Sequence, residues 1–252
     1  MKQQLAPVIA ELQRWHDQGL TLPLWWRDDD AIAPSQALDR LLSLAEGFDA
    51  PLHLAVVPRP AEDALAERLQ DAARAFAIPH GWQHRNHAPP DEKKAEFGAH
   101  RPTQIMLDEV TRGWRRIEKM LGPRALPVFT PPWNRACPAV VEGLAGAGFT
   151  AVSTFFPRVR KYPSPNLLQV NTHLDPIDWR AGGSLVDPAA LAAEIAAQLI
   201  DRRQGRADNS EPFGLLTHHL AHDERVWSFT ATLVEQLTQS GVAKWTSPLE
   251  AI

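Results

Sequence analysis

The stretch LPLWWRDDDA, residues 22–31, joins an apolar run of five residues to four consecutive charged side chains. The apolar run predicts a buried strand. The charges that follow it are Arg27, Asp28, Asp29 and Asp30. Three adjacent carboxylates repel one another unless water or a cation stabilises them. Taken alone, the stretch is most simply a solvated turn after a strand, and a cation site is the alternative.

The same short apolar runs recur along the chain, separated by amphipathic segments of about 10–15 residues, and this pattern predicts parallel strands joined by helices. The runs begin at Leu22, Leu52, Phe76, Leu126, Phe149, Leu167, Phe213 and Val242. Seven or eight alternations in 252 residues match a single α/β domain, residues 1–252, folded as a (β/α) barrel. An open doubly wound sheet is the alternative.

Three of the expected helices have recognisable ends. Residues 107–121 place apolar side chains on one face, and Gly122 followed by proline predicts the stop. Asp187 followed by proline predicts an N-cap and the start of another helix. Ser35 is expected to cap a third helix, which closes near Gly47.

The composition is that of an ordinary globular chain. It is 44% hydrophobic and 22% charged, which excludes disorder, collagen and disulfide scaffolds, and the single Cys137 cannot form an internal disulfide. A formal net charge of −4 without a dense Lys/Arg tract gives no reason to expect nucleic acid as a partner. Residues 1–19 are amphipathic and interrupted by charges. We therefore expect no signal peptide, no membrane association and a cytoplasmic protein.

The segment HGWQHRNH, residues 80–87, follows the third predicted strand. His80 and His84 are four residues apart, the spacing that puts two imidazoles on one side of a helical turn, within reach of one metal. A hydrogen-bonded surface pair would show the same spacing. The long polar stretch that starts at His87 is a candidate active-site loop.

Two further polar segments follow predicted strands. FTPPWNR, residues 129–135, combines a rigid proline pair with Trp133, whose flat face is of the kind on which sugar rings stack. A structural turn with a packed Trp explains this segment equally well. LDPIDWR, residues 174–180, brings carboxylates and Trp179 after another strand, or it forms a capped turn with an ion pair.

The segment GLLTHHLAHD, residues 214–223, runs an apolar strand straight into His218 and His219. Titratable groups at the strand ends of a (β/α) barrel gather on one face, so catalysis explains this pair better than packing does. Adjacent residues on a strand point to opposite faces. Only one of the two imidazoles can therefore face the interior or mouth of the barrel.

The order of these motifs resembles that of the polysaccharide deacetylase family, also called the NodB-homology group or carbohydrate esterase family 4. An aspartate cluster, HxxxH, a Pro-Pro aromatic loop, Asp-Trp and a strand-ending histidine follow one another from residue 22 to residue 223. The resemblance implies a distorted (β/α) barrel with one divalent metal bound by an aspartate and two histidines. It also implies that a second aspartate acts as the base and a late histidine as the acid.

Carried onto this chain, the resemblance implies that Asp30, His80 and His84 bind the metal, that Asp29 is the base and that His218 is the acid. Zinc suits the mixed nitrogen and oxygen ligands, and cobalt, nickel, manganese and iron are alternatives. The expected substrate-binding residues are Arg27, Pro132, Trp133, Asn134, Arg135, Trp179 and His219.

Two of these assignments keep an alternative. The aspartate pair of the family matches either Asp29 and Asp30 or Asp28 and Asp29, so Asp29 belongs to the pair in both registers. In the second register Asp29 is the ligand and Asp28 the base. His219 is the alternative to His218 as the acid.

This chain departs from the family pattern in three places. The usual glycine after the aspartate pair is missing, and Thr130 stands where an arginine usually opens the third motif. That arginine orients the catalytic aspartate, so its role either passes to Arg27 or Arg135 or is absent. The segment EKKAEFG, residues 92–98, has no counterpart in the common motifs.

The expected function is therefore that of a metal-dependent hydrolase that removes N-acetyl or related acyl groups from a carbohydrate or amino sugar. Without a signal peptide a cell-wall polymer fits poorly, so a cytoplasmic or small amide substrate is expected. One alternative is a hydrolase of another non-peptide C–N bond, in a cyclic amide or ureide. The other is a catalytically inactive homologue that binds carbohydrate or metal.

Overall fold

The computed structural model describes residues 1–251, and its central element is the long strand β1 (Leu22–Ala31). Four parallel strands complete this sheet: β2 (Leu52–Val56), β3 (Ala75–Pro79), β9 (Phe213–Thr217) and β10 (Ala243–Trp245). The start of β1 pairs with β10, its middle with β9 and its end with β2, which pairs in turn with β3. Arg27 and Asp28 are thus held between β9 and β2, and the last residues of β1 pair with β2 alone.

Two smaller sheets lie beside the first one. The parallel strands β4 (Val128–Phe129), β5 (Ala151–Val152) and β6 (Leu168–Gln169) form one of them, and the antiparallel pair β7 (Ile177–Asp178) and β8 (Ser184–Leu185) forms the other. Isolated parallel bridges connect the sheets, at His80 with Thr130 and at Leu174 with Leu215.

The expected α/β class is confirmed, but the strands form separate sheets instead of one continuous barrel of seven or eight strands. β4, β5 and β6 have only two residues each. Pro127 precedes β4, and Pro131 and Pro132 follow it closely. A proline has no backbone N–H to donate to a ladder, so pairing in this region stays short.

Side chains from the five-stranded sheet and from the β4–β5–β6 sheet nevertheless pack together in one buried core. Trp25, Ala55, Ile78, Val128 and Ala151, one from each of β1 to β5, form a single buried apolar cluster. Because alternate strand residues point to one face, the sheets must curve around this cluster. The carboxyl ends of the parallel strands therefore face a common region.

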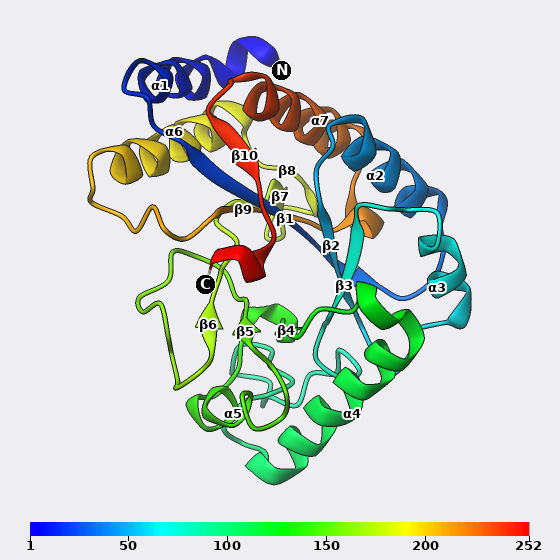
Figure 1. The fold of residues 1–252 in the computed structure, drawn as a ribbon. Helices are drawn as coiled ribbons and strands as arrows, with labels where there is room; N and C mark the ends of the chain where they lie inside the picture. The colour runs from blue at the N-terminus through cyan, green and yellow to red at the C-terminus, as the bar shows by residue number, and fades with distance from the viewer. Residues whose placement is uncertain (252) are drawn as a thin grey trace.

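Helices cover the outside of the sheets (Figure 1). They are α1 (Ala6–Asp17), α2 (Gln36–Gly47), α3 (Asp63–Leu69), α4 (Thr103–Leu121), α5 (Pro138–Gly143), α6 (Pro188–Arg203) and α7 (Glu224–Gln239), with the 3₁₀ turns η1 (Lys2–Leu5), η2 (Gly122–Arg124), η3 (Pro132–Asn134), η4 (His219–Ala221) and η5 (Pro248–Ala251). No helix within residues 1–251 is both long enough and apolar enough to cross a bilayer.

The three predicted helix ends are confirmed. The Ser35 hydroxyl accepts a hydrogen bond from the backbone N–H of Leu38 at 3.0 Å, at the start of α2. The Asp187 carboxylate accepts one from the N–H of Ala190 at 2.8 Å, at the start of α6. α4 ends at Leu121, and its C-cap residue Gly122 has a φ of 54°, in the left-handed region that glycine adopts without strain.

Candidate metal and catalytic site

The three adjacent carboxylates at the end of β1 have three different environments. Asp28 is fully buried and bonds to His219, Asp29 pairs with Arg27, and Asp30 faces two other histidines. Successive strand residues point to opposite faces, which separates the first two carboxylates. Each negative charge thus has a donor or cationic partner of its own, and this offsets the repulsion expected from the sequence.

Asp30, His80 and His84 form a group suited to a metal ion. The Oδ1 atom of Asp30 lies 3.2 Å from Nε2 of each histidine. The three ligand atoms all lie within 4.8 Å of one another. Asp30 Oδ1 is buried, and a divalent cation bound between it and the two imidazole nitrogens would satisfy all three atoms. Two imidazole nitrogens and one carboxylate oxygen make a set that leaves coordination positions open for water and substrate.

The pKa shifts of Asp30 and His84 favour the forms that bind a metal. The pKa of His80 is instead raised, because burial, which would lower it, is outweighed by the charge of Asp29 and the hydrogen bond with Asp30. Burial by itself would raise the pKa of Asp30, but hydrogen bonding and charge from His80 and then charge from His84 lower it below its ordinary value. Burial lowers the pKa of His84, and the charge of His80 adds to this. A carboxylate that stays ionised and an imidazole that stays neutral are the forms that bind metals.

A loop, and not the expected helical turn, brings His80 and His84 together. The chain reverses after β3 through Gly81, with a φ of 61°, and His84 itself has a φ of 55°. A Cβ atom on Gly81 would lie 2.5 Å from the Pro132 ring, so only glycine fits there. Nδ1 of His80 lies 3.1 Å from the carbonyl oxygen of Thr130. A proton on Nδ1 donated to that carbonyl leaves Nε2 free for a metal.

Glu96 holds this loop in place and was missed by the sequence analysis. Its buried carboxylate accepts hydrogen bonds from the backbone N–H groups of Trp82, Gln83 and His84, at 3.2, 2.9 and 3.3 Å. The neighbouring Phe97 is fully buried in an apolar cluster and anchors the segment. In the sequence, Glu96 is an acid in a polar stretch, and its only signal is the adjacent aromatic residue.

The Asp29 carboxylate is fixed by a bidentate pair with Arg27. Nε of Arg27 lies 2.8 Å from Oδ1, and Nη2 lies 3.0 Å from Oδ2. Arg27 also donates to the Asn134 side chain and the Ser153 hydroxyl, both at 2.7 Å. Its side chain is completely buried, so it contacts Asp29 and not a substrate in solution. Contrary to the expectation that Arg27 binds substrate, the structure buries it against Asp29.

The other candidate for the orienting role of the third-motif arginine does not bond to Asp29. Arg135 donates through Nη1 to the carbonyl of Lys94 at 2.9 Å, and within residues 1–251 it makes no hydrogen bond or ion pair with Asp29. Thr130, which stands at the usual arginine position, is buried and its hydroxyl has no partner among the described residues. Among the described residues, the guanidinium that contacts Asp29 comes from β1 itself and not from the third motif.

His218 lies between two carboxylates. Its Nε2 is 4.0 Å from Oδ2 of Asp29, and its Nδ1 is 3.9 Å from Oδ2 of Asp175. Trp179 donates from Nε1 to Asp175 at 2.8 Å and contacts the His218 ring edge-on, with centroids 4.8 Å apart. Burial raises the pKa of Asp175. The sequence analysis identified Trp179 as a candidate site residue but not Asp175.

His219 occupies a different environment from its neighbour. Its side chain is completely buried, and Nδ1 bonds to Asp28, which also accepts from the Thr217 hydroxyl at 2.6 Å. Burial by itself would lower the pKa of His219, but the charge of Asp28 raises it. The structure therefore gives His219 no exposed surface for a substrate, contrary to the expectation, and places it in a buried pair below the site.

The Pro-Pro aromatic loop borders the metal group. The Trp133 ring lies 4.4 Å from the His84 ring, centroid to centroid. Trp133 and Asn134 both have positive φ angles, 55° and 57°, which turn the chain sharply at this point. Pro132 is buried and packs against the His80–His84 loop, so it shapes the site without facing a substrate. Trp133 and Asn134 stay partly exposed, and Arg135 is exposed.

The fold is similar to that of solved carbohydrate esterase family 4 structures. A family 4 carbohydrate esterase from Streptomyces lividans in complex with acetate has a TM-score of 0.57 at 16% identity, over 91% of this chain and 95% of that one. A candidate polysaccharide deacetylase from Mycobacterium smegmatis has a TM-score of 0.67 at 15% identity, over 92% and 88%. A family 4 acetyl xylan esterase from Clostridium thermocellum in complex with a cobalt ion has a TM-score of 0.53 at 15% identity, over 91% and 89%.

These similarities concern the fold. The matched structures also include a carbohydrate esterase family 4 pseudoenzyme, so the fold alone does not establish catalysis. No protein-family model matches the sequence. No curated protein matches it either.

Replacement of either histidine of the metal group is expected to remove the metal. His80→Ala and His84→Ala each delete one of three protein ligands, so metal content after purification should fall severely in both. His87→Ala, in the same loop but outside the group, is the matched control. Elemental analysis of the purified proteins measures the stoichiometry. Wild-type stoichiometry in both variants would contradict the site.

Loss of the Glu96 carboxylate is expected to weaken metal binding without changing a ligand. In Glu96→Gln one acceptor oxygen becomes a donor that faces backbone N–H groups, so the loop bearing His84 loosens. Partners behind metal ligands typically contribute about 10–100-fold in affinity. Competition with a chromogenic chelator measures the change, with Glu92→Gln as the control from the same loop. Unchanged affinity in the folded variant would refute the bracing role.

Proposed function

We propose that this protein is a metal-dependent deacetylase that hydrolyses the N-acetyl or a related acyl group of a carbohydrate or amino sugar. The observation that carries the proposal is the position of Asp29, which Arg27 holds rigidly beside His218 and which is next in the chain to Asp30 of the metal group. The fold similarity to family 4 carbohydrate esterases supports the same reaction class.

Asp29 is the general base in this proposal. Asp30, His80 and His84 would hold a divalent cation, which would supply Lewis acidity at the acyl carbonyl and lower the pKa of a water. The Asp29 carboxylate accepts the proton of that water as it attacks. The bidentate contact with Arg27 keeps both carboxylate oxygens in one orientation, so the base needs no reorganisation during the reaction.

His218 is the general acid. Cleavage of the C–N bond expels an amine, which leaves readily only when it is protonated. Nε2 of His218 faces the Asp29 side of the site, and Asp175 on the Nδ1 side stabilises the protonated ring. Trp179 holds both partners, through a hydrogen bond to Asp175 and an edge-on contact with His218.

Zinc is the metal we propose, because two imidazoles and one carboxylate suit it, and cobalt, nickel, manganese and iron suit the same donors. The cobalt ion in the acetyl xylan esterase structure supports a divalent first-row metal. Trp133 and the half-exposed Trp179 offer aromatic faces for a sugar ring beside the site. The cytoplasmic location expected from the sequence stays a prediction.

The inactive-homologue alternative rested on the missing third-motif arginine. That alternative assumes that no guanidinium orients the catalytic aspartate. Arg27 makes a bidentate contact with Asp29, and this favours catalysis. A hydrolase of a cyclic amide or ureide would use the same groups. Metal analysis of the purified protein, followed by a substrate screen that detects released acetate, separates these functions. Turnover of a cyclic amide or ureide without release of acetate from any N-acetyl sugar would contradict the proposal.

Asp29→Asn is expected to abolish most activity and keep the metal. Asparagine preserves the size of the side chain but cannot accept the proton of water, so kcat should fall by about 10²-fold or more. Acetate release and metal content are measured on the same preparation, with the exposed Asp108→Asn as the control. Loss of the metal would instead make Asp29 the ligand and Asp28 the base.

His218→Ala and His219→Ala are expected to differ in kind. Without His218 the leaving amine stays unprotonated, so kcat should fall strongly with little change in KM or metal content, and the alkaline limb of the pH–rate profile should disappear. Without His219 the buried Asp28 loses its partner, so the melting temperature should fall. Kinetics and thermal melts of both variants test this. If His219→Ala is stable but inactive and His218→Ala is nearly normal, His219 and not His218 is the general acid.

A further inference from the structure

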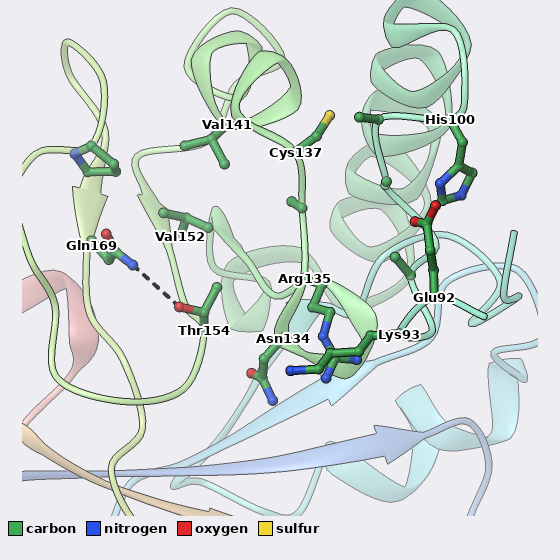
Figure 2. A pocket seen from close by; sticks show the side chains of 15 residues that line it. Glu92, Lys93, His100, Asn134, Arg135, Cys137, Val141, Val152, Thr154 and Gln169 are labelled. Carbon is green, nitrogen blue, oxygen red and sulfur yellow. Dashed lines mark hydrogen bonds between the residues drawn. The ribbon is translucent and has the colours of Figure 1, made fainter. Parts of the chain in front are cut away.

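A cavity of about 700 Å³ is lined in part by Asn134 and Thr154, both of which bond to Arg27. Its walls come from the loop of residues 92–100, from the segment 134–137 and from β5 and β6 with their connections (Figure 2). Ligand pockets typically have volumes of about 300–1,000 Å³, so this one can hold a group of the size of a monosaccharide or larger.

Two wall residues connect the cavity to Asp29 through Arg27. The Asn134 side chain accepts a hydrogen bond from Arg27 at 2.7 Å, and the carbonyl of Thr154 accepts one at 3.2 Å. Trp133, the residue before Asn134, contacts His84. Asn134 thus belongs to the cavity wall and to the hydrogen-bond set of Arg27, and its neighbour Trp133 borders the metal group.

Lys93 and Arg135 give this cavity a cationic wall. Both residues line it, and within residues 1–251 neither makes an ion pair with an acidic side chain. Arg135 is held by its bond to the Lys94 carbonyl and adjoins Asn134, so one charge lies at the end nearest Arg27. Figure 2 shows Lys93 and Arg135 at the Asn134 end, and Glu92 on the side of His100.

The remaining walls suit the body of a sugar. Gln169 donates to the Thr154 hydroxyl at 3.3 Å on the wall formed by β5 and β6, where both groups can bond to substrate hydroxyls. Val141 and Cys137 line the opposite end, as Figure 2 shows, and give it an apolar surface. The cavity thus combines cations at one end, hydrogen-bonding groups along a wall and an apolar end.

We propose that this cavity is a subsite for an anionic part of the substrate, so that the protein acts on an N-acyl amino sugar that carries a phosphate or a carboxylate. The inference rests on the proposed function for the reaction, but the binding preference can be measured without it. Arg135 forms bidentate contacts with either anion, and Lys93 adds a second charge.

The test compares the binding of three compounds to the metal-loaded protein by calorimetry: N-acetylglucosamine, its 6-phosphate and N-acetylmuramic acid. We expect at least one charged compound to bind about 10-fold or more tightly than the neutral one. In the double variant Lys93→Gln/Arg135→Gln, the ratio of the two dissociation constants, neutral compound over charged compound, should fall toward one. The double variant Arg160→Gln/Lys161→Gln removes two charges outside the cavity wall and should keep the preference.

Each outcome decides between the two proposals. A preference for the phosphate or for the carboxylate identifies the anion. Equal binding of all three compounds, or a preference that survives Lys93→Gln/Arg135→Gln, overturns the subsite, because an anion held only by the metal would not respond to these residues. Acetate release from the neutral sugar without any binding preference leaves the deacetylase and refutes the subsite. Selective binding of a charged compound without acetate release from any compound supports the subsite and refutes the deacetylase.

Discussion

The buried pair between Arg27 and Asp29 is the contact on which the rest of the site depends. A guanidinium and a carboxylate removed from water are stable only when their hydrogen-bonding groups are satisfied. Asn134, Ser153 and the Thr154 carbonyl complete the set around Arg27. Removing one partner from such a pair typically costs about 3–5 kcal/mol. One side chain thus ties the end of β1 to the third-motif loop and to the segment after β5, and it orients the proposed base at the same time.

The proposed metal group depends on the backbone geometry of the loop after β3. His80 and His84 converge because the chain reverses at Gly81 and because the Glu96 carboxylate holds the three N–H groups that this reversal leaves free. In the long polar loop, Glu96 therefore holds the turn that bears His84, and Lys93 lines the cavity. A single loop connects the metal group with the anionic subsite that we propose.

Much of the fold could be predicted from local signals. All eight apolar runs are strands, and the caps at Ser35, Asp187 and Gly122 lie where side-chain chemistry requires them. The short hairpin of β7 (177–178) and β8 (184–185) was missed, because neither strand lies in one of the apolar runs from which strands were predicted. The closed barrel was expected from the number of strands, but prolines next to β4 limit the pairing that closure requires.

The sequence alone determined which residues could do chemistry, because charged and titratable side chains directly after apolar runs must lie at strand ends, and strand ends of parallel sheets converge. It could not assign partners among three adjacent aspartates or two adjacent histidines, since a one-residue shift of register exchanges their faces. Only the tertiary structure decided that Asp28 is paired with His219 in the interior, that Arg27 is buried against Asp29, and that Glu96 is buried. Those contacts join residues that are far apart in the chain, except for Arg27 and Asp29, and their geometry depends on how the sheets pack, which no local pattern encodes.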